Sequence, residues 1–189
     1  MGNSQADKAA NHERIVRTAS ARIRRDGMDG ASVAELMAEA GLTHGGFYRH
    51  FDSRDELVAE AVESALAHGS NRTNAAAETG GSDALAAIID SYLSRLHRDK
   101  PETGCAVAAL PTDIIRSNPR AREAYSAQVR RYIDLLAGLT SDGDRDEAQL
   151  VLAALIGGLL LARAVDDRAL SDEILASVAN ALHRVLGSP

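Results

Sequence analysis

The sequence predicts an all-α fold, and three observations lead to this prediction. Apolar residues recur at helical spacing from one end of the chain to the other, whereas no segment shows the strict alternation of a strand. Ala and Leu dominate the apolar residues, and only 3% of the chain is aromatic, a composition that favours helices. The 189 residues are 45% hydrophobic and 25% charged, so the chain can bury a core.

Two helical patterns, the second of them short, open the chain. The first helix is expected over about 8–26, with Gly27 as its stop. Ser32 and Glu35 have the spacing of a capping box, in which each side chain bonds the backbone of the other. This box is predicted to begin a short amphipathic helix that Gly41 ends.

Another short helix and a long one are expected next. Thr43 is expected to cap a helix that runs to about His50. A second capping box, from Ser53 to Glu56, begins a long amphipathic helix. That helix is expected to dissolve into a flexible connection over 74–81, where two glycines end the segment.

The second part of the chain shows further helical segments. Apolar residues from Leu85 to Leu96 recur at helical spacing after Ser82. The helices expected after them cover 104–117 with an interruption at Pro111, 119–139 with Pro119 in the first turn, 144–165, and 171–187 starting at Ser171. The segment 144–165 is apolar nearly all round, so it should be buried on several sides.

The charge distribution divides the chain into two parts. Residues 1–52 hold seven Lys and Arg against seven Asp and Glu, so residues 53–189 carry the whole net charge of −6. We therefore predict two domains, 1–52 and 53–189, that face different partners.

Composition also limits the compartment. One Cys excludes an internal disulfide framework and a Cys-based zinc cluster, and it fits a reducing compartment. The longest uncharged stretch, Ala148–Ala162, has 15 residues, fewer than the roughly 18–20 that span a bilayer. No secretory signal is recognisable at the start of the sequence. We expect a cytoplasmic protein with no membrane partner.

Residues 32–51 form the most informative motif, a predicted helix-turn-helix. The turn is centred on Gly41, because it needs a left-handed conformation that glycine adopts without penalty. Phe47 and Phe51 are four residues apart and can anchor the second helix to the core. This leaves five residues to point outward: Thr43, His44, Gly45, Tyr48 and Arg49.

The composition of the second helix suits a nucleic acid. No acidic residue occurs from Thr43 to Phe51, as a phosphate-facing surface requires. Gly45 and Gly46 are poor helix formers but allow the backbone to approach a DNA groove closely. The alternative is an ordinary small helical domain whose glycines and aromatic residues serve tight packing.

These residues resemble a known family. Residues 10–68, and FYRHFDSRDELVAEA above all, are similar to the N-terminal domain of TetR-family transcriptional regulators. The rest of the chain resembles the ligand-binding, dimerising domain of that family in its helix lengths. The stretches 104–110 and 164–175 also resemble one branch of the family.

The resemblance implies how the motif meets DNA. The second helix of the motif would enter the major groove, with Thr43, His44, Gly45, Gly46, Tyr48 and Arg49 as base or backbone contacts. Tyr48 and His50 match a Tyr-x-His pattern that grips phosphates, and Ser32 and Arg54 would sit beside the backbone. The neutral charge of this domain departs from the usual basic patch. Arg22, Arg24 and Arg25 either supply positive surface or form a solvated helix end.

The second domain is predicted to bind an effector and a second copy of the chain. Segments 144–165 and 171–187 would pair with the same segments of another protomer in a four-helix bundle, giving a homodimer. Gly157 and Gly158 mark either that contact or packing within one protomer. The predicted ligand-binding residues are Tyr92, Leu96, Cys105, Leu110, Ile114, Gln128 and Tyr132. Their mainly aliphatic character favours a small apolar or aromatic effector.

We therefore predict a transcriptional regulator, a repressor that binds a palindromic double-stranded operator and leaves it when an effector binds. One alternative is a small-molecule binding protein with a vestigial helix-turn-helix. Another is an electrophile or redox sensor that acts through Cys105, whose position after Gly104 resembles that in regulators responding to electrophiles. A third, an all-helical enzyme, lacks support.

No catalytic or metal site emerges from the sequence. His97 has Asp99 and Glu102 near it but no nucleophile, and no histidine pair has metal-ligand spacing. Three further histidines are expected to be solvated: His12, His68 and His183. We expect no catalytic residues, no metal and no cofactor.

Overall fold

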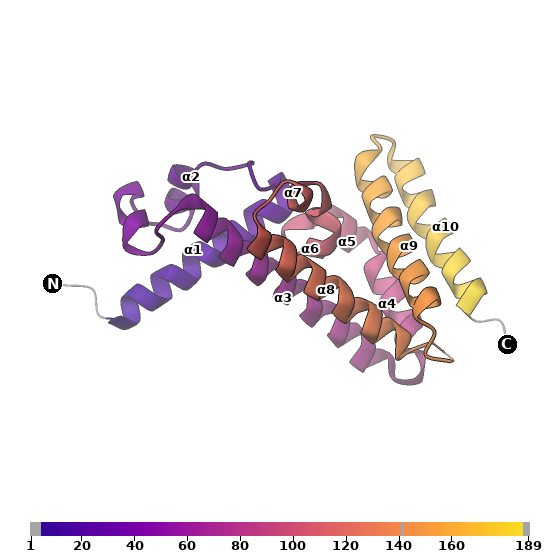
Figure 1. Cartoon of the computed structure of the whole chain (residues 1–189). Helices are drawn as coiled ribbons and strands as arrows, with labels where there is room; N and C mark the ends of the chain where they lie inside the picture. Colours follow the sequence, from indigo (N-terminus) through magenta and orange to yellow (C-terminus); the bar gives the residue numbers. More distant parts are fainter. Residues whose placement is uncertain (1–4, 141, 187–189) are drawn as a thin grey trace.

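The computed structural model describes residues 5–140 and 142–186, and within these ranges it contains helices and no strand. The helices are α1 (Gln5–Asp26), α2 (Val33–Glu39), η1 (His44–Arg49), α3 (Arg54–Gly80), η2 (Gly81–Asp83), α4 (Ala84–Tyr92), α5 (Arg95–Asp99), η3 (Pro101–Thr103), α6 (Ala106–Ala109), α7 (Pro111–Ile115), α8 (Pro119–Ala137), α9 (Arg145–Ala164) and α10 (Arg168–Leu186). The all-α prediction is confirmed. Figure 1 shows an elongated molecule, with α1, α2 and η1 at one end and the pair α9–α10 at the other.

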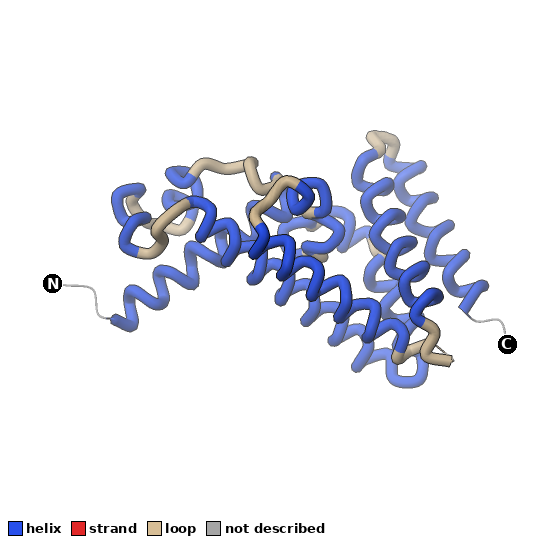
Figure 2. The backbone as a smooth tube through the Cα atoms, viewed as in Figure 1, coloured by secondary structure: helices blue, strands red, loops and turns tan. Residues whose placement is uncertain are grey.

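The N-terminal end follows the expected local signals. The capping box is complete, because the Ser32 hydroxyl accepts from the Glu35 amide and the Glu35 carboxylate accepts from the Ser32 amide at 2.7 Å. Gly27 and Gly41 both have positive φ, +81° and +70°, in the short loops that Figure 2 shows on either side of α2. These turns let α2 and η1 close over α1, whose Ile15 is fully buried.

The long helix α3 joins the N-terminal helices to the middle of the molecule, since it packs on α1, α4 and α8. Its predicted capping box is half present: Ser53 accepts from the Glu56 amide, but the Glu56 carboxylate bonds the amide of Asp52 instead. The expected flexible connection over 74–81 is wrong, because α3 stays helical to Gly80. The predicted domain boundary at 52 and 53 remains a prediction.

Two helix boundaries in the second part differ from expectation. The pattern from Leu85 to Leu96 is divided, because Ser94 caps the separate helix α5 by accepting from the His97 amide. Helix α10 begins three residues before Ser171, because the Asp167 carboxylate caps its first turn. In both cases a polar side chain next to the apolar pattern decided the boundary.

Helix α9 packs against several elements, as expected for a segment that is apolar nearly all round, but one face of it stays exposed. It packs against α8 and α10, while Leu150 and Leu161 on its outer side are largely exposed. Its length and composition would suffice to cross a membrane, but one such helix packed into a helical core does not indicate a membrane protein. Gly158 serves packing within the protomer, because a Cβ there would lie 3.2 Å from Val178.

Candidate nucleic-acid interface

The second helix of the predicted motif is a 3₁₀ turn rather than an α-helix. It runs over His44–Arg49, and the predicted side-chain cap by Thr43 is absent. The amide of Gly46 instead donates to the Thr43 carbonyl at 2.9 Å, which closes the tighter turn. Two adjacent glycines favour an α-helix poorly, which explains why this segment departs from the regular geometry.

Two phenylalanines hold this segment on the core, as predicted. Phe47 and Phe51 are almost completely buried, with their ring centroids 5.5 Å apart. Because both rings face inward, the intervening residues face outward: Tyr48 is 72% exposed and Arg49 is also exposed. The result is a rigid support for an exposed segment, which is what a recognition surface requires.

The remaining predicted residues of the segment lie on the same surface. Thr43, His44 and Gly45 are exposed, and Gly46 is half-buried. A Cβ at Gly45 would have no heavy atom within 4 Å, so packing within this chain does not require a glycine there. Close approach of a partner backbone remains a reason for glycine at this position.

His50 is half-buried directly behind this surface. Its Nδ1 atom is enclosed and has no hydrogen-bond partner among the described residues. Burial lowers the pKa of His50, and the positive groups of His12, Lys8 and Arg49 lower it further. His50 therefore lies in a positive environment that an anion would stabilise.

Two of the histidines expected to be solvated have partners. His12 lies 2.8 Å from the Glu60 carboxylate and stacks on Phe51, with ring centroids 4.6 Å apart. His183 lies 2.8 Å from Asp90. Both side chains stay about one third exposed, and the sequence did not indicate these partners because they lie on other helices.

Arg54 and Ser32 flank the surface but are already hydrogen-bonded. Arg54 donates to the Met28 carbonyl at 2.7 Å and to Asp29 at 3.1 Å, which ties the start of α3 to the loop after α1. Ser32 is exposed and bonded within its capping box. Both are near in sequence to the segment His44–Arg49, called the recognition segment below, and their contact with DNA remains a prediction.

The arginines at the end of α1 supply little free positive charge. Arg22 pairs with Asp26 at 2.9 Å and with Glu39 at 3.3 Å, and Arg25 pairs with Asp26. Arg24 is buried instead of solvated, and burial lowers its pKa. Arg24 therefore neither supplies positive surface nor belongs to a solvated helix end, because α1 packs against η3 at this point.

The capped helix α2, the glycine turn after it and the exposed, acid-free segment η1 together define a helix-turn-helix DNA-binding protein. The family described as bacterial regulatory proteins, tetR family, matches residues 15–61. An uncharacterised HTH-type transcriptional regulator of Mycobacterium tuberculosis is 31% identical over 163 residues, which cover 80% of this chain and 83% of the relative. The chain belongs to the TetR family, whose members are transcriptional regulators and not enzymes.

Solved structures share the whole fold. A TetR transcriptional regulator from Chloroflexus aurantiacus has a TM-score of 0.79 at 23% identity, and the match covers 95% of this chain and 98% of that one. Escherichia coli NemR, in a structure of its reduced form, has a TM-score of 0.79 at 19% identity with the same coverage. At these identities the likeness concerns the fold.

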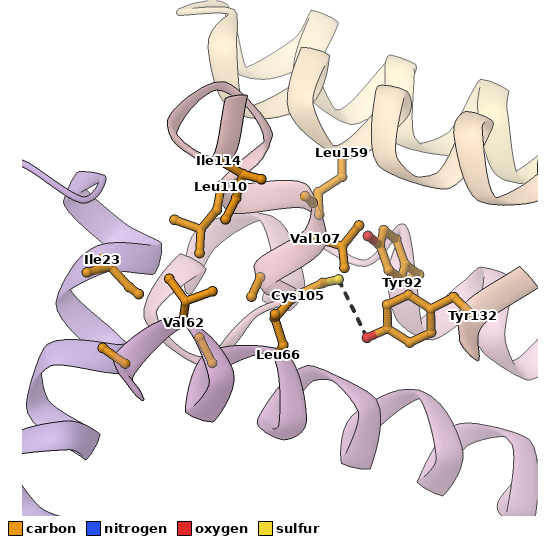
Figure 3. Close-up of a cluster of buried hydrophobic side chains, with 14 of the residues drawn as sticks. Ile23, Val62, Leu66, Tyr92, Cys105, Val107, Leu110, Ile114, Tyr132 and Leu159 are labelled. Carbon is orange, nitrogen blue, oxygen red and sulfur yellow. Dashed lines mark hydrogen bonds between the residues drawn. The ribbon is translucent and has the colours of Figure 1, made fainter. Parts of the chain in front are cut away.

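The predicted effector-binding residues form part of one buried core. The buried members of this set are Tyr92, Cys105, Leu110, Ile114, Gln128 and Tyr132. Figure 3 shows the Cys105 thiol facing the Tyr132 hydroxyl, at 3.7 Å, with Leu110 and Ile114 on the far side of Cys105 from the two tyrosines. Leu96 lies apart from them, because it is on the separate helix α5 and is 58% exposed.

The space beside Cys105 is small. A cavity of about 10 Å³ lies among α3, α4 and the start of α6, at the limit for a single water molecule. Its lining consists of Gly69, Thr73, Ala76, Ile88, Ser91, Tyr92, His97 and Cys105. A Cβ at Gly69 would lie 3.2 Å from the Tyr132 hydroxyl, so this glycine allows α3 to approach the cluster closely. An effector could enter only if these helices moved apart.

His97 is a residue of this cluster that sequence reasoning missed. It is 1% exposed, its Nδ1 lies 2.7 Å from the Tyr92 carbonyl, and its Nε2 accepts from the Cys105 amide at 2.9 Å. These two bonds require a neutral ring with the proton on Nδ1. The cap at Ser94, three residues earlier, was the available sequence signal for a helix start here.

Tyr92 and Tyr125, two of the tyrosines near Cys105, have raised pKa values. Burial, followed by the neighbouring Cys105, raises the pKa of Tyr92 well above its ordinary value. The same causes raise the pKa of Tyr125 to about 12, and its hydroxyl donates to the Val107 carbonyl. Both hydroxyl groups therefore keep their protons at neutral pH.

The outer face of α9 and α10 forms an apolar groove of about 390 Å³. It is lined by Glu147, Leu150, Val151, Ala154, Ser177, Val178, Ala181, Leu182, Val185 and Leu186. Leu150 and Val185 are each 60% exposed there. An apolar surface of this kind indicates an interface with another protein.

Proposed function

We propose that this TetR-family regulator is a cytoplasmic homodimeric repressor that binds a palindromic operator and is released by a small apolar or aromatic effector. The observation that carries the proposal is the exposed, acid-free segment His44–Arg49 on its buried phenylalanine support. A side chain as exposed as Tyr48 has little role in folding, so selection for a partner accounts for it best.

The apolar groove on α9 and α10 supports the dimer. Two copies of this face would bury Leu150 and Val185 in a four-helix bundle, which removes apolar surface from water. A dimer also provides the two recognition segments that a palindrome needs, about 34–36 Å apart for half-sites one turn apart. Leu150→Glu should give monomers in analytical ultracentrifugation without unfolding, and a Leu150→Glu protein that stays dimeric would contradict the assignment.

Helix α3 supports the link between effector and DNA. Gly69, Thr73 and Ala76 of α3 line the small cavity beside Cys105, while Arg54 in the first turn of α3 bonds the loop next to the recognition helices. An effector that pushes α3 outward at the cavity would therefore displace its first turn. A tenfold loss of DNA affinity needs only about 1.4 kcal/mol of differential binding.

The experiment that tests this function is a gel-shift and anisotropy titration with duplexes selected by the protein from a random library. Unmodified dimer should retain a palindromic sequence, and Tyr48→Ala should weaken binding about tenfold or more while the melting temperature stays unchanged. A panel of small apolar and aromatic compounds should include some that release the DNA. Failure to select any duplex would support the vestigial alternative, and hydrolysis or conversion of a bound compound would support an enzyme.

A further inference from the structure

A second groove lies at the DNA-binding end, between the first turns of α1 and the recognition segment. Its volume is about 490 Å³. It is lined by Gln5, Lys8 and Asn11 of α1, Met37 of α2, and Leu42, Thr43, Gly46, Arg49 and His50 of the turn and η1. Figure 1 shows the start of α1 at the same end of the molecule as η1. We propose that this groove holds a stretch of the operator sugar–phosphate backbone, with Lys8 as a phosphate contact outside the helix-turn-helix.

The charge of the groove supports this occupant. Its lining includes Lys8, Arg49 and His50 and contains no Asp or Glu. Within residues 5–140 and 142–186, neither Lys8 nor Arg49 forms an ion pair, whereas Arg22, Arg25 and Arg54 all do. Lys8 and Arg49 therefore bring uncompensated positive charge to the groove.

The hydrogen-bonding groups also suit phosphate oxygens. Arg14 donates to the Oδ1 atom of Asn11, so the amide nitrogen of Asn11 is left as a donor. Thr43 adds an exposed hydroxyl that does not bond the helix it precedes. Donors with no competing carboxylate match a phosphodiester, whose oxygens only accept.

The shape of the groove favours a chain of nucleotides over a free anion. Its floor includes the buried side chain of Met37 and the half-buried Leu42, which are apolar surfaces suited to deoxyribose. The groove is continuous with the recognition segment, because Gly46 and Arg49 belong to both and Thr43 directly precedes the segment. A DNA strand contacted by Tyr48 would therefore continue along the groove toward Lys8.

This inference rests on the proposed DNA-binding function, so the test keeps the two apart. Lys8→Ala removes the charge in the groove, and Arg17→Ala removes an exposed charge on the same helix outside it. The duplex selected by the unmodified protein is titrated with both variants and with Tyr48→Ala over a range of KCl concentrations. Melting temperatures measured in parallel check that both α1 variants fold.

Lys8→Ala should weaken binding about three- to tenfold at low salt and reduce the slope of log affinity against log salt by about one. Arg17→Ala should leave both within about twofold. Loss of binding by Tyr48→Ala alone, with Lys8→Ala unaffected, would overturn the groove assignment and leave the DNA-binding function standing. Equal losses for Lys8→Ala and Arg17→Ala would overturn it too, because they would show general attraction by the helix.

A neutral backbone identifies the source of the phosphate. Methylphosphonates, each of which removes the charge of one phosphate, are placed singly along the selected duplex. At the phosphate that Lys8 contacts, this replacement should make the affinities of the unmodified protein and of Lys8→Ala equal. Inorganic phosphate at millimolar concentration should leave the melting temperature unchanged. Stabilisation by phosphate that Lys8→Ala abolishes, without any such position on the duplex, would assign the groove to a free anion and contradict the proposal.

Discussion

The recognition segment and the cluster around Cys105 differ in where their polar groups lie. In the recognition segment two buried phenylalanines support side chains that already face solvent, with Tyr48 beside an open groove. In the inner cluster the polar groups of His97 and Cys105 are buried and bonded to each other, beside a cavity that barely holds water. The first region can bind without rearranging, whereas the second must open to bind anything larger.

This difference indicates where regulation resides. A surface that is preorganised loses little free energy on binding, so DNA affinity depends on keeping its support rigid. In the inner cluster, an effector would have to separate helices that are held together by van der Waals contacts, so its binding would change the packing of the core. In the proposed function, the DNA-bound state is then the one in which this cavity is too small for an effector.

The largest expected effect concerns the support of the recognition segment. Phe47→Ala should destabilise the protein by about 3–5 kcal/mol, because it removes a buried ring and leaves a cavity. Tyr48→Ala, one residue away, should change stability by no more than about 0.5 kcal/mol. Chemical denaturation of both variants measures the contrast, and equal destabilisation would show that Tyr48 is part of the core after all.

A pair of glycines tests the two regions at the backbone. A Cβ at Gly104 would lie 2.9 Å from the His97 ring and 3.0 Å from the Arg163 guanidinium, so Gly104→Ala should cost about 1–3 kcal/mol. Gly45→Ala meets open space and should leave stability unchanged or slightly raised, while it weakens DNA binding. Thermal unfolding and anisotropy of both variants check this, and tolerance of Ala at position 104 would refute the tight packing of the cluster.

The thiol tests how closed the inner cluster is. Cys105 is 3% exposed, so in the native protein it should react with a thiol reagent far more slowly than in guanidinium. DNA release by an electrophile or mild oxidant should then be absent in both the unmodified protein and Cys105→Ser. Release confined to the unmodified protein would establish the electrophile-sensor alternative and show that the cluster opens readily.

The smallest effect is the pH dependence of the two regions. Because the pKa of His50 is lowered in the folded protein, the unfolded chain binds more protons, and stability should fall as the pH drops from about 6.5 through that lower pKa. A nearby phosphate would favour the protonated ring, so DNA affinity should rise over the same interval.

Tyr92 and Tyr125 of the inner cluster should contribute nothing in this interval, since burial raises their pKa values. NMR titration of the His50 ring, with and without DNA, provides the measurement, and His50→Gln is the control. If stability and DNA affinity depend on pH in His50→Gln as they do in the unmodified protein, His50 is not the cause.

The sequence by itself determined the all-α class, the capping box at Ser32, the turn at Gly41 and the family. These features depend on residues within about four positions of one another, and that spacing is visible in the chain. Only the tertiary structure decided that Lys8 lies beside His50, that Arg24 is buried, and that Leu96 turns outward while His97 turns in. Such placements follow from which helices pack together, and the free energy of that packing comes from contacts between residues far apart in the sequence.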